Sequence, residues 1–177
     1  MTISSFEGKS PRLGTGSWVH PSADVIGDVE VGERCWIGPG ARLRGDYGRI
    51  VLGDCCAVED NCVIHARPGE TCTIGSWVTL GHGCVVHNVK SIHDYTVIGM
   101  LAVISDWAEI GEWAVVGEGA VVSQGVVVPA GRIAVGIPAR LMEKSVDEAF
   151  RAAWRGFKQV YVDLCRRYAE GYRETGA

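Results

Sequence analysis

The sequence predicts an all-β solenoid, a parallel β-helix with a prism-shaped cross-section, and three observations lead to this fold class. Aliphatic residues recur at intervals of six along most of the chain. Small residues, β-branched residues or cysteines follow many of them four positions later. Residues 145–173 then change to helical spacing. The first two observations predict the coils of the solenoid, and the third predicts a terminal helix beside it.

Eighteen six-residue repeats open with an aliphatic residue, and only two steps between them differ from six. The repeats open at Val19, Val25, Val31, Ile37, Leu43, Leu52, Val58, Ile64, Ile74, Leu80, Val86, Ile92, Ile98, Ile104, Ile110, Val116, Val122 and Val128. A period of six stays on neither face of an α-helix, and isolated strands would not keep phase over this length. Each repeat therefore predicts one short strand and a corner, with its aliphatic residue pointing inward. Three repeats complete a coil, so about six coils are expected.

The terminal segment predicts one α-helix packed against the solenoid. Its apolar stripe consists of Val146, Ala149, Phe150, Ala153, Trp154, Phe157, Val160, Tyr161, Leu164 and Tyr168. The letters SVDE at 145–148 predict a capping box between Ser145 and Glu148. Because this stripe is too apolar for water, the helix should lie along the β-helix or along a neighbouring subunit. The chain is thus expected to form a β-helix over residues 1–140 and a helical segment over 141–177, within one domain.

Composition excludes several classes of function. The chain has 177 residues, 47% of them hydrophobic, and a formal net charge of −4, which gives no electrostatic case for binding nucleic acid or an anionic membrane. No stretch approaches the roughly 20 apolar residues of a spanning helix, so we expect a soluble, cytoplasmic protein. Seven cysteines without a CxxC motif are expected to be reduced and mostly buried. Cys62 and Cys84 should stack in neighbouring coils, within possible disulfide range.

The count of repeats predicts where three histidines lie on the faces of the β-helix. His65 and His87 are the second residues of repeats three apart, so they should stack in one column with Arg44, neighbours being roughly 4.8 Å apart. Asp60 and His82 are third residues of another such pair and should stack on the adjoining face. Two histidines therefore converge, whereas His82 lies round a corner, which favours a site completed by a second subunit. In another interpretation the histidines merely occupy polar corners.

Four segments carry a resemblance to a known family: LRGD at 43–46, GDCCAVEDNCVIH at 53–65, GHGCVVH at 81–87 and IGM at 98–100. Together with the repeats and the terminal helix, they resemble the γ-class carbonic anhydrase family of left-handed β-helix trimers. The branch most similar to this chain contains phenylacetate-degradation and carnitine-operon proteins. The resemblance implies left-handed coils and a homotrimer with sites between subunits.

The resemblance also implies roles for individual residues. His65 and His87 match metal ligands from one chain, and His82 matches the ligand from the next, while Arg44 and Asp46 match an interface ion pair. Three neutral imidazoles suit one divalent ion per site, Zn best and Fe or Co as alternatives. Such an ion lowers the pKa of bound water to roughly 7. The resemblance therefore implies reversible CO2 hydration by metal-bound hydroxide.

Two departures from the family pattern concern the expected chemistry. Ala57 and Glu59 stand where the carbonic anhydrases carry Asn and Gln near the metal water. A carboxylate at position 59 can accept a proton, so we group Glu59 with Arg44, Asp46 and Asp60 as candidate catalytic residues. Alternatively, Glu59 simply pairs with Arg44 or another cation. The family's acidic proton-shuttle loop is also missing, which puts efficient CO2 hydration in doubt.

Three other functions remain open. The first is hydrolysis of acyl-CoA thioesters at the same metal site, with Glu59 as general base. The second is acyl transfer, because VGIPAR at 135–140 resembles the segment that follows the last β-helix coil in hexapeptide-repeat acyltransferases. The third is a metal-binding or assembly subunit without turnover. The expected partners are two further copies of the chain and a small substrate, either CO2/bicarbonate or an acyl-CoA.

Overall fold

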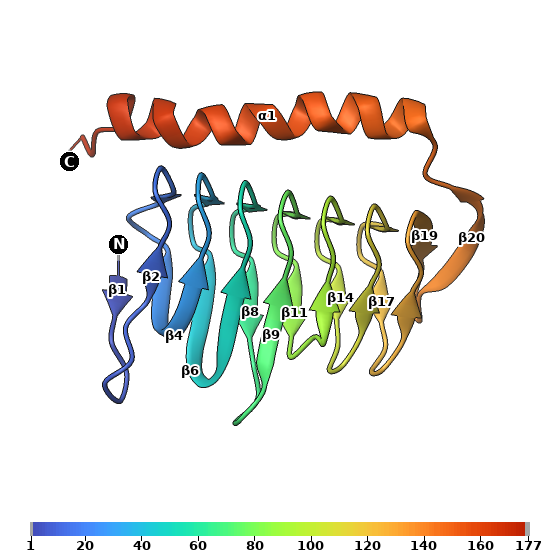
Figure 1. Ribbon diagram of the computed structural model, residues 1–177, viewed down its shortest axis with the longest axis horizontal. Helices are drawn as coiled ribbons and strands as arrows, with labels where there is room; N and C mark the ends of the chain where they lie inside the picture. Colours follow the sequence, from blue (N-terminus) through green and yellow to red (C-terminus); the bar gives the residue numbers. More distant parts are fainter. Residues whose placement is uncertain (1, 176–177) are drawn as a thin grey trace.

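A computed structural model describes residues 2–175 and shows a parallel β-helix with one long helix, α1 (Glu148–Gly171), along it (Figure 1). The predicted period of six is confirmed by the strand pairing. For example, β10 (Thr79–Leu80) pairs in parallel with β7 (Ala57–Val58) on one side and with β13 (Val97–Ile98) on the other. Each coil therefore stacks on the coil before it.

One face of the prism is an eight-stranded sheet, which we call the helix-covered sheet. Its spatial order is β3 (Trp18–Val19), β5 (Trp36–Ile37), β7, β10, β13, β16 (Val115–Val116), β19 (Arg132–Val135) and β20 (Arg140–Ser145). Every strand but the last runs parallel to its neighbours, and β20 returns antiparallel to β19. An antiparallel strand at this end covers an edge that would otherwise expose unpaired backbone groups.

The other two faces belong to one twelve-stranded sheet that continues round a corner. Its strands are β1 (Thr2–Ser4), β2 (Arg12–Leu13), β4 (Asp24–Val31), β6 (Arg42–Leu52), β8 (Val63–His65), β9 (Thr71–Ile74), β11 (Val85–His87), β12 (Ser91–Ile92), β14 (Val103–Ile104), β15 (Glu109–Ile110), β17 (Val121–Val122) and β18 (Val127–Val128). The long strand β6 pairs with β8 near its start and with β9 near its end, which joins the two faces.

The solenoid has about seven turns, about one more than the six coils that the repeats predicted. At the start, Ile3 pairs with Val25 and Leu13 pairs with Val31, ahead of the first predicted repeat. These two residues are not six apart, because a β-bridge between Phe6 and Lys9 interrupts them. At the far end, β19 adds a further inward residue, Ala134, which is too small to register as an aliphatic repeat.

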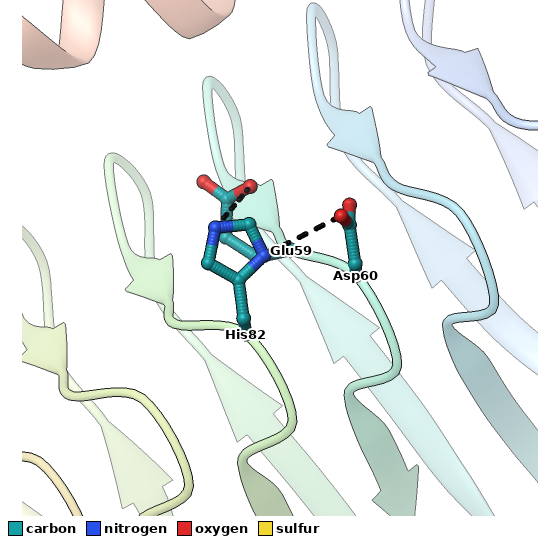
Figure 2. Close-up of side chains that lie close together, drawn as sticks. All are labelled: Glu59, Asp60 and His82. Atoms are coloured by element: carbon teal, nitrogen blue, oxygen red, sulfur yellow. Dashed lines mark ion pairs between the residues drawn. The ribbon is translucent and has the colours of Figure 1, made fainter.

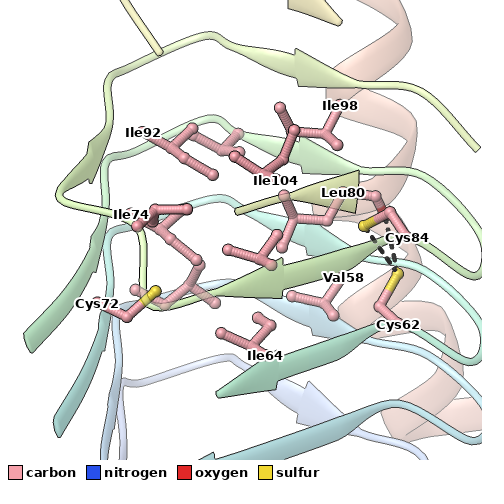
Figure 3. Packing of buried hydrophobic residues seen from close by; sticks show 14 of the residues in the cluster. Val58, Cys62, Ile64, Cys72, Ile74, Leu80, Cys84, Ile92, Ile98 and Ile104 are labelled. Atoms are coloured by element: carbon pink, nitrogen blue, oxygen red, sulfur yellow. Dashed lines mark hydrogen bonds between the residues drawn. The ribbon is translucent and has the colours of Figure 1, made fainter. Parts of the chain in front are cut away.

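The core runs along the axis of the prism and is built from the inward residue of each repeat (Figure 3). Ile64, for example, is fully buried and lies between Leu43 and Val86 in the paired strands. Cys62 and Cys84 are also fully buried, as free thiols whose sulfur atoms lie 3.6 Å apart. Stacked aliphatic layers of this kind remove apolar surface from water along the whole solenoid.

Helix α1 lies along the helix-covered sheet of its own chain, one of the two positions that the sequence allowed (Figure 1). The predicted capping box is wrong, because Ser145 ends β20 and pairs with Arg132. Instead Asp147 caps the helix, its Oδ1 accepting a hydrogen bond of 2.8 Å from the backbone N–H of Phe150. In the part of the chain described here, no helix is both long and apolar enough to cross a membrane.

The buried face of α1 is rotated from the predicted stripe. Lys158, Val162 and Cys165 are its buried residues. By contrast, Phe157 is 46% exposed and Val160 is 47% exposed, although both belong to the predicted apolar stripe. Near the end of the helix, Tyr168 packs on Trp18 and Trp36, which stack on each other with ring centroids 5.1 Å apart.

Candidate functional site

The predicted column of Arg44, His65 and His87 is present. Arg44 of β6 is in register with His65 of β8, which is in register with His87 of β11. The two imidazole rings lie with their centroids 5.5 Å apart and their planes tilted by 44°. The hydrogen-bonded register of three adjacent coils thus brings both histidines to one face of the prism, as counting by six requires.

Asp46 joins this column through two contacts. Its Oδ2 accepts a hydrogen bond of 2.6 Å from Arg44 Nη1, and its Oδ1 lies 3.1 Å from His65 Nε2. Burial alone would raise the pKa of Asp46, but the hydrogen bonds from Arg44 and His65 outweigh it and hold the pKa below its ordinary value. Burial lowers the pKa of His65, so its ring is neutral near pH 7. Its Nε2–H therefore donates to Asp46, which leaves the lone pair on Nδ1.

His87 has a carboxylate partner that the sequence reasoning missed. Asp106 follows β14, which pairs with β11, and its Oδ2 lies 3.3 Å from His87 Nδ1. The guanidinium of Arg67 forms a close ion pair with the same carboxylate and holds the pKa of Asp106 at about 2, against the effect of burial. Because an ionised carboxylate only accepts hydrogen bonds, Nδ1 of His87 is the ring nitrogen that donates to Asp106. The signal available in the sequence was the position of Asp106, one coil beyond His87.

A second cluster lies on the adjoining face, where Glu59 and Asp60 follow β7 and His82 follows β10 (Figure 2). His82 Nε2 is 3.9 Å from Glu59 Oε2, and His82 Nδ1 is 3.6 Å from Asp60 Oδ2. Among residues 2–175, this is the one group of three or more His, Cys, Asp or Glu side chains whose ligand atoms all lie within 4.8 Å of one another. The predicted stacking of Asp60 and His82 is therefore confirmed, with Glu59 as an additional neighbour.

Glu59 is the buried member of this cluster. Glu59 as a whole residue is 4% exposed, whereas the side chain of His82 is 50% exposed. Burial raises the pKa of Glu59, although the Tyr161 hydroxyl of α1 and the nearby His82 partly oppose this effect. Its Oε1 is buried without a hydrogen bond of good geometry to any described residue. Within one chain Glu59 does not pair with Arg44, which contacts Asp46, and its ion-pair contact is instead with His82.

The donor atoms of the histidines suit a transition metal ion. In each of His65 and His87, one ring nitrogen contacts a carboxylate. The second nitrogen of each ring has no hydrogen bond to residues 2–175. A carboxylate behind each imidazole is the usual way in which proteins orient histidine ligands of a metal. Within one chain, however, His82 lies with Glu59 and Asp60, and the three histidines do not form one group within 4.8 Å. A three-histidine centre would thus need His82 from a second chain.

Known proteins share this architecture. Residues 90–124 match the family described as Bacterial transferase hexapeptide (six repeats). Carnitine operon protein CaiE of Salmonella newport (strain SL254) is 36% identical over 176 residues, covering 99% of this chain and 87% of that protein. Among solved structures, a hexapeptide transferase family protein from Anaplasma phagocytophilum is 28% identical with a TM-score of 0.89, covering 94% of this chain and 98% of that one.

A second solved structure, WeeI from Acinetobacter baumannii, is 31% identical with a TM-score of 0.62 and covers 70% of this chain and 57% of its own. The match to CaiE extends over nearly the whole sequence. This protein therefore belongs to the hexapeptide-repeat transferase family that includes the carnitine operon protein CaiE.

Proposed function

We propose that this protein is a metal-dependent enzyme that adds water to the carbonyl carbon of its substrate. His65 and His87 of one chain and His82 of a neighbouring chain in a homotrimer would hold one divalent ion, with Zn the best match to imidazole donors. The observation that carries the proposal is the column of His65 and His87, each held from behind by a carboxylate of an adjacent coil. When bound, such an ion supplies an acidic water and polarises a carbonyl oxygen.

Glu59 favours acyl thioesters, such as acyl-CoA, as the substrate class. It contacts His82 and is almost fully buried, so its carboxylate is placed to take a proton from an incoming water. The water oxygen would form a bond to the carbonyl carbon, the C–S bond would break, and Glu59 would return its proton to the leaving thiolate. The products are a carboxylic acid and a free thiol, and no further reactant is needed.

Reversible CO2 hydration at the same site is the second candidate. The three-histidine set, which resembles that of the γ-class carbonic anhydrases, favours it, because an ion held by these residues would supply the acidic water that hydration of CO2 needs. The buried Ala57 weighs against it, because a methyl group replaces an amide that could orient the water. Arg44, Asp46 and Asp60 would then act by positioning His65 and His82 rather than by touching substrate.

Acyl transfer is the third candidate, favoured by the match of residues 90–124 to the transferase hexapeptide family. It needs an acceptor nucleophile in place of water, so it predicts activity only when an amine or alcohol is added. A binding or assembly role without turnover predicts bound metal and no reaction on any of these substrates. These outcomes separate the candidates in one set of assays.

The test is metal analysis of protein purified without added zinc, followed by assays of CO2 hydration and of acyl-CoA hydrolysis. We expect about one divalent ion per chain and thioester hydrolysis that a chelator removes and Zn restores. Glu59→Gln should lower hydrolysis by about 10²- to 10⁴-fold without lowering metal content. Glu70→Gln, at an exposed loop position, is the matched control and should keep full activity. Full thioesterase activity in metal-free protein would refute the proposal.

A further inference from the structure

A cavity of about 230 Å³ lies between α1 and the helix-covered sheet, next to the Glu59 cluster. Its walls are mostly apolar. Trp154, Phe157 and Tyr161 contribute from α1, and Val97, Ile98 and Met100 contribute from β13 and the turn after it. Glu59 and His82 also line the cavity. Apolar walls that converge on a few polar groups are the usual composition of a small-molecule site.

Two polar atoms of the cavity-lining residues point to the kind of ligand. Nε1 of Trp154 and Oε1 of Glu59 are both buried without a hydrogen-bond partner among residues 2–175. An indole N–H only donates, so its missing partner is an acceptor. Native proteins rarely leave such groups unsatisfied, and each one costs on the order of 1–3 kcal/mol. An acceptor oxygen on a ligand with an apolar body would satisfy the indole N–H, whereas Oε1 of Glu59, itself an acceptor when ionised, needs a donor such as a water molecule.

We propose that this cavity binds the short acyl group of the substrate, with its carbonyl oxygen accepting from Trp154 Nε1, its carbonyl carbon beside Glu59 and His82, and its hydrocarbon tail between Phe157 and Met100. The inference rests on the proposed thioester hydrolysis and names the substrate class of that site. At about 230 Å³, the cavity is smaller than the roughly 300–1,000 Å³ of pockets that hold drug-sized ligands. It therefore accommodates a short chain or a single ring, and the thiol carrier stays outside.

Chain-length preference tests the proposal. Phe157→Ala enlarges the cavity and should raise the ratio of kcat/KM for octanoyl-CoA to that for butyryl-CoA by about tenfold or more, since one methylene in an apolar pocket changes discrimination by roughly 10- to 200-fold. Met100→Trp narrows the cavity and should move the ratio the other way. Val160→Ala is the matched control, because Val160 lies on the same helix with nearly the same exposure as Phe157 but does not line the cavity.

A binding measurement separates this inference from the proposed function. Calorimetry with a non-hydrolysable ketone analogue of butyryl-CoA should show binding that Met100→Trp weakens about tenfold, whereas binding of CoA alone stays unchanged. If Met100→Trp weakens binding of the analogue in this way but no thioester is hydrolysed, the pocket proposal is supported and the proposed function is wrong. If thioesters are hydrolysed with the same chain preference in all variants, and Met100→Trp binds the analogue normally, the pocket proposal is wrong. Thermal unfolding of each variant shows whether its fold is intact.

Discussion

At the scale of single residues, the histidine column is organised by carboxylates that come from neighbouring coils. Asp46 accepts from His65, and Asp106 contacts His87 while Arg67 holds it in place. Because the pKa of Asp106 is about 2, this carboxylate stays ionised across the physiological range. A fixed charge behind the ring selects one tautomer and one orientation, which raises the donor strength of the opposite nitrogen.

The first prediction concerns Asp106. Asp106→Asn keeps the shape of the side chain but removes the charge behind His87, so we expect zinc affinity to fall by about 10- to 100-fold. Competition with a coloured chelator measures the affinity. Asp163→Asn, an exposed carboxylate of α1 that only accepts from Gln159, serves as the control and should bind zinc like the unmodified protein. Equal zinc affinity in both variants would show that Asp106 has no part in holding the ligand.

Much of this column could be predicted from sequence, because a period of six fixes which residues share a face. The phase of the repeats placed His65 above Arg44 and below His87, and Asp60 beside His82. It places Asp106 one coil beyond His87, but the contact between them could not be predicted, since the phase does not give the side to which a side chain leans. Nor could it show that Glu59 is buried, because the burial comes from α1, whose Tyr161 faces that carboxylate.

At the scale of elements, α1 carries a buried lysine against the helix-covered sheet. Lys158 is 2% exposed, and its Nζ donates a hydrogen bond of 2.8 Å to Thr79 Oγ1. Burial lowers the pKa of Lys158 to about 7, a change that the nearby Cys56 only slightly opposes. The unfolded chain, with an ordinary lysine pKa of 10.5, binds a proton more readily than the folded one. Folding therefore opposes protonation of this group.

The second prediction follows from that difference. Lys158→Met removes a buried group that must be protonated at low pH, so it should raise the free energy of unfolding by on the order of 1 kcal/mol or more near pH 7. The penalty in the unmodified protein is full below pH 7 and is relieved as pH rises toward 10.5. The advantage of the variant should therefore shrink between about pH 6.5 and about pH 9.5.

Urea unfolding at both pH values and one protein concentration measures this advantage, with Lys144→Met at an exposed position of β20 as the control. An advantage that is the same at both pH values would mean that Lys158 does not titrate between them. The sequence pattern could not identify Lys158 as buried, because a lysine next to an apolar stripe is normally interpreted as lying at the solvent-exposed edge of the helix face. The start of α1 was misplaced for a related reason: β20 extends through Ser145 by pairing with β19, and this pairing is a tertiary contact.

At the scale of the whole molecule, the solenoid presents its two histidine clusters on adjoining faces. The stacked strands fix the position of every corner, so neither cluster can approach the other without breaking the ladder of hydrogen bonds between coils. Alongside His65 and His87, the same face presents Val63, which is 36% exposed, and partly buried Val85. An apolar strip beside two metal-type donors suits contact with another copy of the chain, whose His82 would complete the set.

The third prediction tests this sharing of ligands. His65→Ala and His82→Ala proteins should each bind little zinc, because every interface of the proposed homotrimer would then lack one imidazole. When the two are mixed and allowed to exchange subunits, some interfaces combine an intact His65 and His87 on one chain with an intact His82 on the next. Zinc content and thioesterase activity should then recover in part. Random assembly from equal amounts restores only the interfaces with that pairing, so recovery stays well below the level of the unmodified protein.

The control is a mixture of His65→Ala with His87→Ala, which should not recover. Both of these substitutions remove ligands that the same chain contributes, so every interface in the mixed trimer still lacks one imidazole. Light scattering at micromolar concentration establishes the trimer, and mass spectrometry of differently labelled chains verifies subunit exchange. If exchange is complete and the first mixture binds no more zinc than its parents, the three histidines do not meet across an interface. The metal would then have to bind within one chain, where His82 already lies with Glu59 and Asp60.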